Sequence, residues 1–313
     1  MARRITTEYD NIISLTGQLS QSSISFPKRR DLAKKLEKQL SSYDVRKRLA
    51  LEVATKTSVD GFSIGARRCQ LLSMLWSNAL SRCILMTKEL MGQSKAKWTI
   101  EDIRLPDKIL RASSQPDDAF DSNGLGIQKL SKKSIRNALK FCLTTLKQDT
   151  TPEGGEQMLM DMLAFLCSKD AYMGCLKYPA DFENIISEIF YYLTEKDDIG
   201  QSMIFESASK AFGNFFGTCN RLGIEVHLFL SDSLEIVSEW CMTNMQRNSI
   251  NSSSCSRQHF FNAIASMLYS HPDLSIGPMK RYGRHILRYC KKAYAASQNF
   301  HKEALNRYLL AHM

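Results

Sequence analysis

The sequence predicts an all-α protein, a HEAT- or armadillo-like α-solenoid of stacked antiparallel helix pairs. The first observation is that 43% of its 313 residues are apolar and 24% charged, which is enough for a core and unlike a disordered chain. The second is a shortage of chain breakers, with 15 glycines and 7 prolines. An all-β sandwich or barrel needs more turns than these supply. The third is that apolar residues recur at helical steps along most of the chain.

The first third of the chain contains three stretches with this spacing. A helix is expected over Thr6–Leu19, and another begins near Pro27, since the first helical turn tolerates proline. In the second helix the apolar positions are four residues apart, at Leu32, Leu36 and Leu40. Gly65–Met91 predicts one long helix or two joined ones.

The remainder of the chain has a more regular pattern of expected helices, which are separated by short segments of turn-forming residues. The expected helices cover residues 127–148, 154–168, 182–194, 199–217, 226–246, 257–270, 278–296 and 299–312. Successive pairs recur at roughly 40–45 residues, the size of a HEAT or armadillo unit. Such pairs bury their faces by stacking, which exposes a long concave surface. A compact helical bundle is the alternative.

The predicted organisation has three parts. Residues 1–111 form an N-terminal helical segment. Residues 112–126 lack periodicity and concentrate turn-forming residues, so they are expected to be a loop or linker. Residues 127–313 form the HEAT-like repeats, which we expect to continue beyond the chain end in a longer parent, because the last helical pattern stops without a cap.

Charge is distributed unevenly. Residues 1–56 and 57–150 each carry a net charge of +6, residues 151–250 carry −9 and residues 251–313 carry +7. Two basic ends around an acidic middle argue against one continuous nucleic-acid groove. No apolar run is long enough to cross a membrane, and the N-terminus has no secretory signal. Nine scattered cysteines are typical of reduced thiols in a cytosolic or nuclear protein.

The sequence identifies no catalytic residue, metal site or cofactor site. Its six histidines are isolated, and no Cys/His cluster with metal-ligand spacing occurs. Phosphate-binding glycine loops are absent, and Asp181-Phe182 is followed by Glu183 and not by the glycine of a kinase D-F-G motif. We therefore expect no small-molecule substrate for this chain, and an enzyme in its own right is the least favoured interpretation.

Two basic clusters are candidate binding sites. The first is the stretch from Lys28 to Lys38, which is a solvated amphipathic helix, a nuclear-localisation cluster or a phosphate-contacting patch. The second places four cations on one helix face, with Tyr282 and Tyr289 beside them. This second face suits a protein partner, solvent or nucleic acid. Its members are Arg281, Arg284, Arg288 and Lys292.

The first cluster also carries a family resemblance. Residues 24–36, ISFPKRRDLAKKL, match four of the five defined positions of a pattern that runs aliphatic, basic, acidic, arginine, aliphatic. This resembles the TAN (telomere-length maintenance and DNA-damage repair) motif at the N-terminus of the ataxia-telangiectasia-mutated (ATM) kinases. The matching residues are Ile24, Lys28, Asp31 and Leu36. Leu32 departs from the pattern, because the family has arginine there.

The segments that follow the motif are similar to the same family, among them the helices around Trp76-Ser77-Asn78-Ala79-Leu80 and Phe260-Phe261. The resemblance implies a HEAT-like solenoid at the head of a large nuclear Ser/Thr protein kinase, whose catalytic domain would lie beyond residue 313. It further implies a role in double-strand-break signalling and telomere maintenance, with the solenoid docking proteins of the break-sensing machinery. The alternative is a stand-alone helical-repeat scaffold whose basic ends bind protein or nucleic acid, including DNA.

Overall fold

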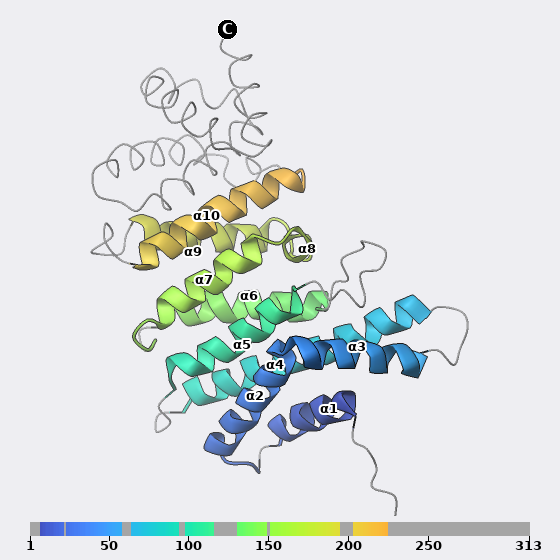
Figure 1. Cartoon of the computed structure of the whole chain (residues 1–313). Coiled ribbons are helices and arrows are strands. Elements are labelled where there is room, and N and C mark those ends of the chain that lie inside the picture. Colours follow the sequence, from blue (N-terminus) through green and yellow to red (C-terminus); the bar gives the residue numbers. More distant parts are fainter. Residues whose placement is uncertain are drawn as a thin grey trace, which may run out of the picture. The chain divides into compact units, whose positions relative to one another are not determined.

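The computed structural model describes residues 7–21, 23–57, 64–93, 98–115, 130–148, 151–194 and 203–224. Every regular element in these ranges is an α-helix, which confirms the predicted all-α class (Figure 1). Within the same ranges, no helix combines the length and the apolar character that crossing a membrane requires. The chain divides into two compact units, Met1–Leu159 and Met160–Met313.

The first unit contains six helices in the described ranges, and the division between the units falls inside the seventh. In order, they are α1 (Glu8–Leu19), α2 (Phe26–Ser41), α3 (Tyr43–Thr57), α4 (Ile64–Met91), α5 (Ile100–Ser113), α6 (Lys132–Leu146) and α7 (Gly155–Cys167). The second unit continues with α8 (Asp170–Met173), α9 (Ala180–Thr194) and α10 (Met203–Arg221). The expected helices beyond residue 224 lie outside the described residues.

Most of the predicted helices in the described ranges are present, with shifted ends. The long stretch at Gly65–Met91 is a single helix, α4. The helix expected from residue 127 begins at Lys132, because the Ser131 side chain accepts a hydrogen bond from Ser134 N and caps it there. Two helices, α3 and α5, were not predicted. Because α5 continues to Ser113, the first two residues of the predicted linker 112–126 are helical, and residues 116–126 lie outside the described part.

In the first unit α4 is the central helix, since it contacts α1, α2, α3, α5 and α6. Its buried face carries a fully enclosed tryptophan and neighbouring apolar residues at helical steps: Leu72, Leu75, Trp76, Ala79, Leu80 and Cys83. The helices around it contribute apolar side chains of the same depth, among them Ile12, Leu36, Leu40, Val53 and Ile103. Their burial is the main stabilising term for this unit.

A proline inside α5 shapes the contact between α4 and α5. Pro106 has no backbone N–H, so it cannot bond to the carbonyl of Asp102 four residues earlier. That carbonyl instead accepts a hydrogen bond of 2.8 Å from the hydroxyl of Thr87, a fully buried residue on α4. The proline therefore frees an acceptor that the neighbouring helix uses.

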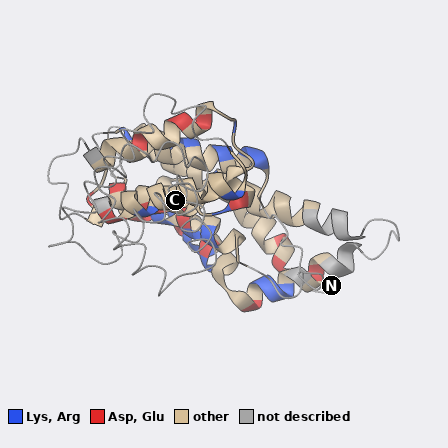
Figure 2. Cartoon of the chain, turned by 90° about the horizontal axis from the view of Figure 1, so that it is seen from above, with Lys and Arg blue, Asp and Glu red and all other residues tan. Residues whose placement is uncertain are grey.

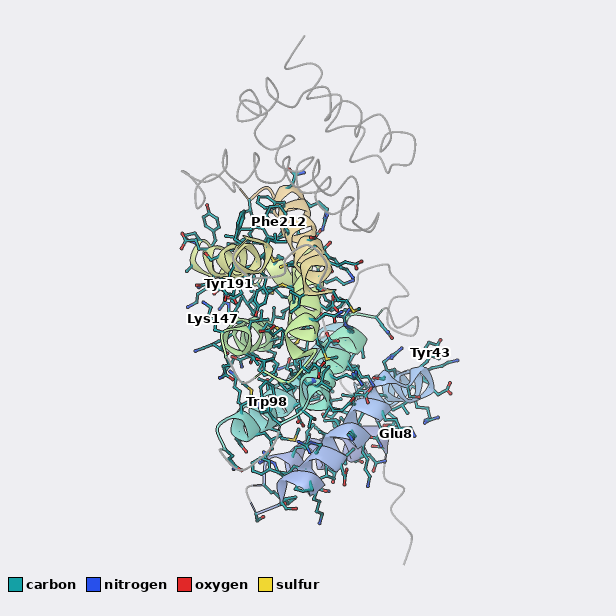
Figure 3. The ribbon with its side chains drawn as sticks, turned by 90° about the vertical axis from the view of Figure 1, so that its left-hand side faces the viewer. Glu8, Tyr43, Trp98, Lys147, Tyr191 and Phe212 are labelled. Carbon is teal, nitrogen blue, oxygen red and sulfur yellow. The ribbon has the colours of Figure 1, made fainter. Side chains whose placement is uncertain are left out.

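In the second unit the core is a cluster of aromatic rings between α9 and α10. The rings of Phe182 and Phe215 are 5.9 Å apart, and those of Phe212 and Phe216 are 4.8 Å apart. All four are at most 1% exposed, whereas Tyr191 is 46% exposed (Figure 3, where Phe212 and Tyr191 are labelled). The aromatic run that the sequence places at residues 212–216 thus packs between helices.

Because of this cluster, we expect alanine substitutions at two apolar residues of α10 to have very different effects on the free energy of unfolding. We expect Phe215→Ala to lower the free energy of unfolding by about 3–5 kcal/mol, because it opens a cavity at a fully buried ring. Met203→Ala on the same helix, at a side chain that is 68% exposed, should change it by less than about 0.5 kcal/mol. Urea unfolding followed by circular dichroism measures both, and equal losses would contradict the packing described.

Candidate partner-binding surface

Helix α2 contains three of the four residues that match the TAN motif, Lys28, Asp31 and Leu36, and it is built around an apolar face. It starts after Ser25, whose backbone is extended, and Pro27 lies in its first turn. Leu36 and Leu40 are fully buried, and Leu32 is 8% exposed. The C-terminal end is capped by the buried Arg46, whose guanidinium donates to the carbonyls of Leu40 and Ser41. The helix is therefore fixed along its length.

Arg29 joins α2 to two other helices. Its Nε donates to the carbonyl of Leu19, the last residue of α1, at 3.2 Å. Its Nη1 lies 2.5 Å from a carboxylate oxygen of Glu89 near the end of α4. The guanidinium also lies 5.3 Å from the centre of the Phe26 ring. Since Arg29 is only 5% exposed, these partners compensate for the removal of its charge from water.

Arg30 joins α2 to α5 through a bidentate ion pair. Its Nε and Nη2 donate to the two carboxylate oxygens of Asp102 at 2.7 and 2.8 Å. Asp102 has no exposed surface, and its Oδ2 also accepts from the backbone N–H and the hydroxyl of Thr99 at 2.8 and 3.1 Å. One buried carboxylate thus holds Arg30 and closes the capping box of α5.

The outward side of α2 carries four lysines, which we call the lysine face. At 100° per residue they lie, together with Asp31, within about 120° of the helix circumference. All five side chains are exposed. Figure 2 marks the basic and acidic residues along the helices. The members of the lysine face are Lys28, Lys34, Lys35 and Lys38.

No member of the lysine face has an ion pair with a described residue, in contrast to the cations of the adjacent α5. There Arg104 pairs with Glu101, and Arg111 pairs with Asp107 at 2.8 Å. Lys108 reaches across to Glu37 of α2 at 3.5 Å. The uncompensated positive charge of this pair of helices therefore lies on α2, where Asp31 leaves a net charge of +3.

The four predicted motif residues do not converge on one point. Lys28 and Asp31 are exposed neighbours one turn apart, whereas Leu36 is fully buried and Ile24 is half-buried just before the helix. The motif therefore divides into an outward charged half and an inward apolar half. The second predicted cluster, Arg281, Arg284, Arg288 and Lys292, lies outside the described residues.

Sequence reasoning missed the two arginines that anchor α2. The basic stretch from Lys28 to Lys38 includes both of them, although Arg29 is seven residues before Leu36 and so falls on the apolar face. Their partners, Glu89 and Asp102, are 60 and 72 residues away. The position of Arg29 on the apolar face indicates that its side chain is buried. The spacing of residues along the chain does not indicate which carboxylates pair with the two arginines.

The metal-ligating and thiol side chains of the described residues are characterised by their grouping and burial. No group of three His, Cys, Asp or Glu side chains there could hold a metal ion. Five cysteines, Cys83, Cys142, Cys167, Cys175 and Cys219, are buried, and burial raises the pKa of Cys83 to about 12. Burial likewise raises the pKa of Cys142 and of Cys219. The reactive thiolate form is therefore scarce at these positions near neutral pH.

Comparison with family models, curated proteins and solved structures finds no match to this chain. The resemblance to the ATM kinases therefore depends on the sequence pattern around α2 and stays a prediction. What the structure adds is the physical setting of that pattern, a helix with an anchored inner face and an unpaired cationic outer face.

The buried ion pair predicts that Asp102 matters far more for stability than the exposed Asp31. We expect Asp102→Asn to lower the free energy of unfolding by about 2–3 kcal/mol, because Arg30 loses a bidentate charged partner. Water partly solvates the unpaired guanidinium in this variant and so limits the loss, since the Arg30 side chain is 25% exposed. Asp31→Asn should change stability by less than about 0.5 kcal/mol. Chemical unfolding of both variants measures the difference, and a neutral Asp102→Asn would contradict the anchoring role.

Proposed function

We propose that this chain is a noncatalytic docking region at the N-terminus of an ATM-like Ser/Thr protein kinase, acting in the nucleus in double-strand-break signalling and telomere-length maintenance. The observation that carries the proposal is the construction of α2. Its TAN-like pattern combines a buried framework with exposed charges that no described residue pairs. Proteins of the break-sensing machinery are the proposed partners.

We further propose that the helices form a HEAT-like α-solenoid. A solenoid stacks equivalent helices in parallel, at a constant offset in sequence. In the first unit α4 and α6 support this arrangement, because Ser77 bonds to Ser131 and Ser81 to Ser134, at offsets of 54 and 53 residues. In the second unit Asn214 of α10 bonds to the carbonyl of Ala164 of α7, at an offset of 50.

The contact between α2 and α5 fits the same arrangement with one insertion. Arg30 pairs with Asp102 and Glu37 with Lys108, so these two helices are also parallel, but at offsets of 72 and 71 residues. The larger offset is explained by α3, which adds 15 helical residues between the two. A compact bundle has no reason to repeat an offset near 50 residues in separate helix pairs. The observed offsets of 50 to 54 residues are longer than the spacing of roughly 40–45 residues that the sequence predicts for successive helix pairs.

A docking role is further supported because the exposed charged residues of the motif are not needed to hold the fold together. Lys28 and Asp31, which match the charged positions of the motif, make no contact that the core requires. Changing them alters the surface that a partner meets while the inner face stays intact. Deleting the whole motif, by contrast, removes Arg29, Arg30 and the buried leucines and tests folding as much as function.

The sharper experiment reverses the charge of the lysine face in the full-length protein that contains this chain. We expect Lys28→Glu, Lys34→Glu, Lys35→Glu and Lys38→Glu together to impair damage signalling in cells and to shorten telomeres. Kinase activity on a peptide substrate should stay largely intact, because no catalytic group is touched. A control for charge reversal elsewhere on the surface changes Lys132 and Lys133, two exposed lysines of α6, to glutamate. Normal signalling by the lysine-face variant would overturn the proposal.

The second candidate is a stand-alone helical-repeat scaffold that binds nucleic acid through its basic ends. It is favoured by one observation, the uncompensated charge of +3 on α2 within the basic N-terminal part. Binding of this kind must weaken steeply with salt, because each neutralised phosphate releases a counterion.

Under that candidate, reversing the charge of the C-terminal cluster should reduce the affinity for duplex DNA and for RNA and flatten the salt dependence. Filter binding between about 50 and 200 mM salt measures both quantities. Unchanged affinity after this reversal would eliminate the C-terminal cluster as a nucleic-acid contact, and unchanged affinity after reversal of the lysine face as well would eliminate the candidate. The residues to reverse are Arg281, Arg284, Arg288 and Lys292.

A further inference from the structure

The unpaired charge on α2 also indicates what kind of partner fits it. We propose that the lysine face binds an acidic α-helical segment of a protein partner, with carboxylates along one side of that helix. The inference rests on the proposed docking role and adds its chemistry. It follows from the width, the length and the rigidity of the surface.

The width of the unpaired charge favours a single helix over a nucleic-acid duplex. On the adjacent α5, each of the three cations forms an ion pair with a carboxylate; these cations are Arg104, Lys108 and Arg111. Among the described cations of α2 and α5, those without a carboxylate partner therefore lie on one side of α2, a strip one helix wide. Specific DNA interfaces are broad, at about 1,000–2,500 Å² of protein surface, and draw phosphate contacts from several elements. A partner helix lying along α2 needs no more than this strip.

The length of the strip matches a short helical segment. Lys28 and Lys38 are ten residues apart, which is about 15 Å along the helix axis at 1.5 Å per residue. The four lysines follow the steps of three, four and seven residues that bring side chains to the same side of a helix. Carboxylates repeated at the same steps over about three turns of a partner would meet them one to one.

The rigidity of α2 makes the strip ready for binding. Its inner side is held by the contacts of Arg29 to Leu19 and Glu89, and by the pair of Arg30 with Asp102. The surface therefore has no folding step to complete when a partner arrives, which lowers the entropic penalty of association. Long lysine side chains remain free to adjust to the spacing of the carboxylates.

Asp31 distinguishes one position along the strip from the others, which a uniform lysine patch would not do. It lies one turn after Lys28 and one turn before Lys34 and Lys35, in the middle of the cations. A carboxylate directly opposite Asp31 would be repelled, so the preferred partner has a neutral or basic residue there. The acid thus selects one register of the acidic helix.

The test uses the full chain and two synthetic peptides that differ only in arrangement. The first has glutamates at helical steps on one side, and the second has the same composition in scrambled order; a 20-base-pair DNA duplex is the third probe. Fluorescence anisotropy measures affinity at low and physiological salt. We expect the one-sided peptide to bind at least tenfold more tightly than the scrambled one, and binding to weaken as salt rises.

Variants of the chain then locate the site. Lys35→Glu with Lys38→Glu should weaken binding of the one-sided peptide at least tenfold, whereas Lys132→Glu with Lys133→Glu should leave it within about twofold. Asp31→Asn should strengthen binding of a peptide that has a glutamate at every facing position. Circular dichroism checks folding, and Lys35→Gln with Lys38→Gln provides a milder pair if the reversal destabilises the helix.

Several results would overturn the inference. These are equal binding of the two peptides, unchanged affinity in the lysine variants, and tight DNA binding that the same variants abolish. Self-association of the chain, lost in those variants, would identify a second copy as the occupant and also overturn it. If the cellular variant fails in signalling while neither peptide binds, the docking function stands and the acidic-helix chemistry is wrong.

Discussion

The arrangement of the first unit depends on how one buried carboxylate is neutralised. Asp102 has no access to water, so its charge must be met within the protein. Arg30 meets it from α2, and Thr99 meets it from the start of α5. Its backbone carbonyl, released by Pro106, accepts from Thr87 of α4. Three helices are therefore fixed at a single residue by its side chain and its main chain together.

This concentration of bonds explains how an exposed cationic helix can be held rigidly. Lysine-rich helices gain little from their outer charges, which repel one another along the same side. In α2 that repulsion is opposed from the inner side by the buried leucines and by the adjacent Arg29 and Arg30. The two arginines reach in different directions, toward α4 and toward α5. The fold thus stabilises a surface whose own electrostatics are unfavourable.

The sequence predicted the fold class and the strongly periodic helices, but not the elements whose local signals conflict. α4 was predictable because its apolar residues repeat over 28 residues. α5 was missed because Pro106 normally ends a helix, and here a tertiary hydrogen bond compensates for the lost one. α3 was missed although Leu49 and Val53 are one turn apart, since charged residues surround them. At the candidate site the exposed lysines were predicted, whereas Glu89 and Asp102 could not be paired with α2 by spacing along the chain.

The departure at Leu32 has a structural meaning. The family pattern has arginine at this position, but here the side chain is 8% exposed and lies on the apolar face of α2. An arginine in that environment would need a buried acceptor or carboxylate of its own. The buried Asp102 already accepts from Arg30, and Glu89 and the Leu19 carbonyl accept from Arg29. Leu32 instead packs on the buried side of α2, so the one departure from the pattern lies in the anchored half of the motif. The outward half, with Lys28 and Asp31, keeps the charges of the pattern. The charges that match the pattern therefore lie on the exposed side of α2, and the one departure lies on the side that packs against the core.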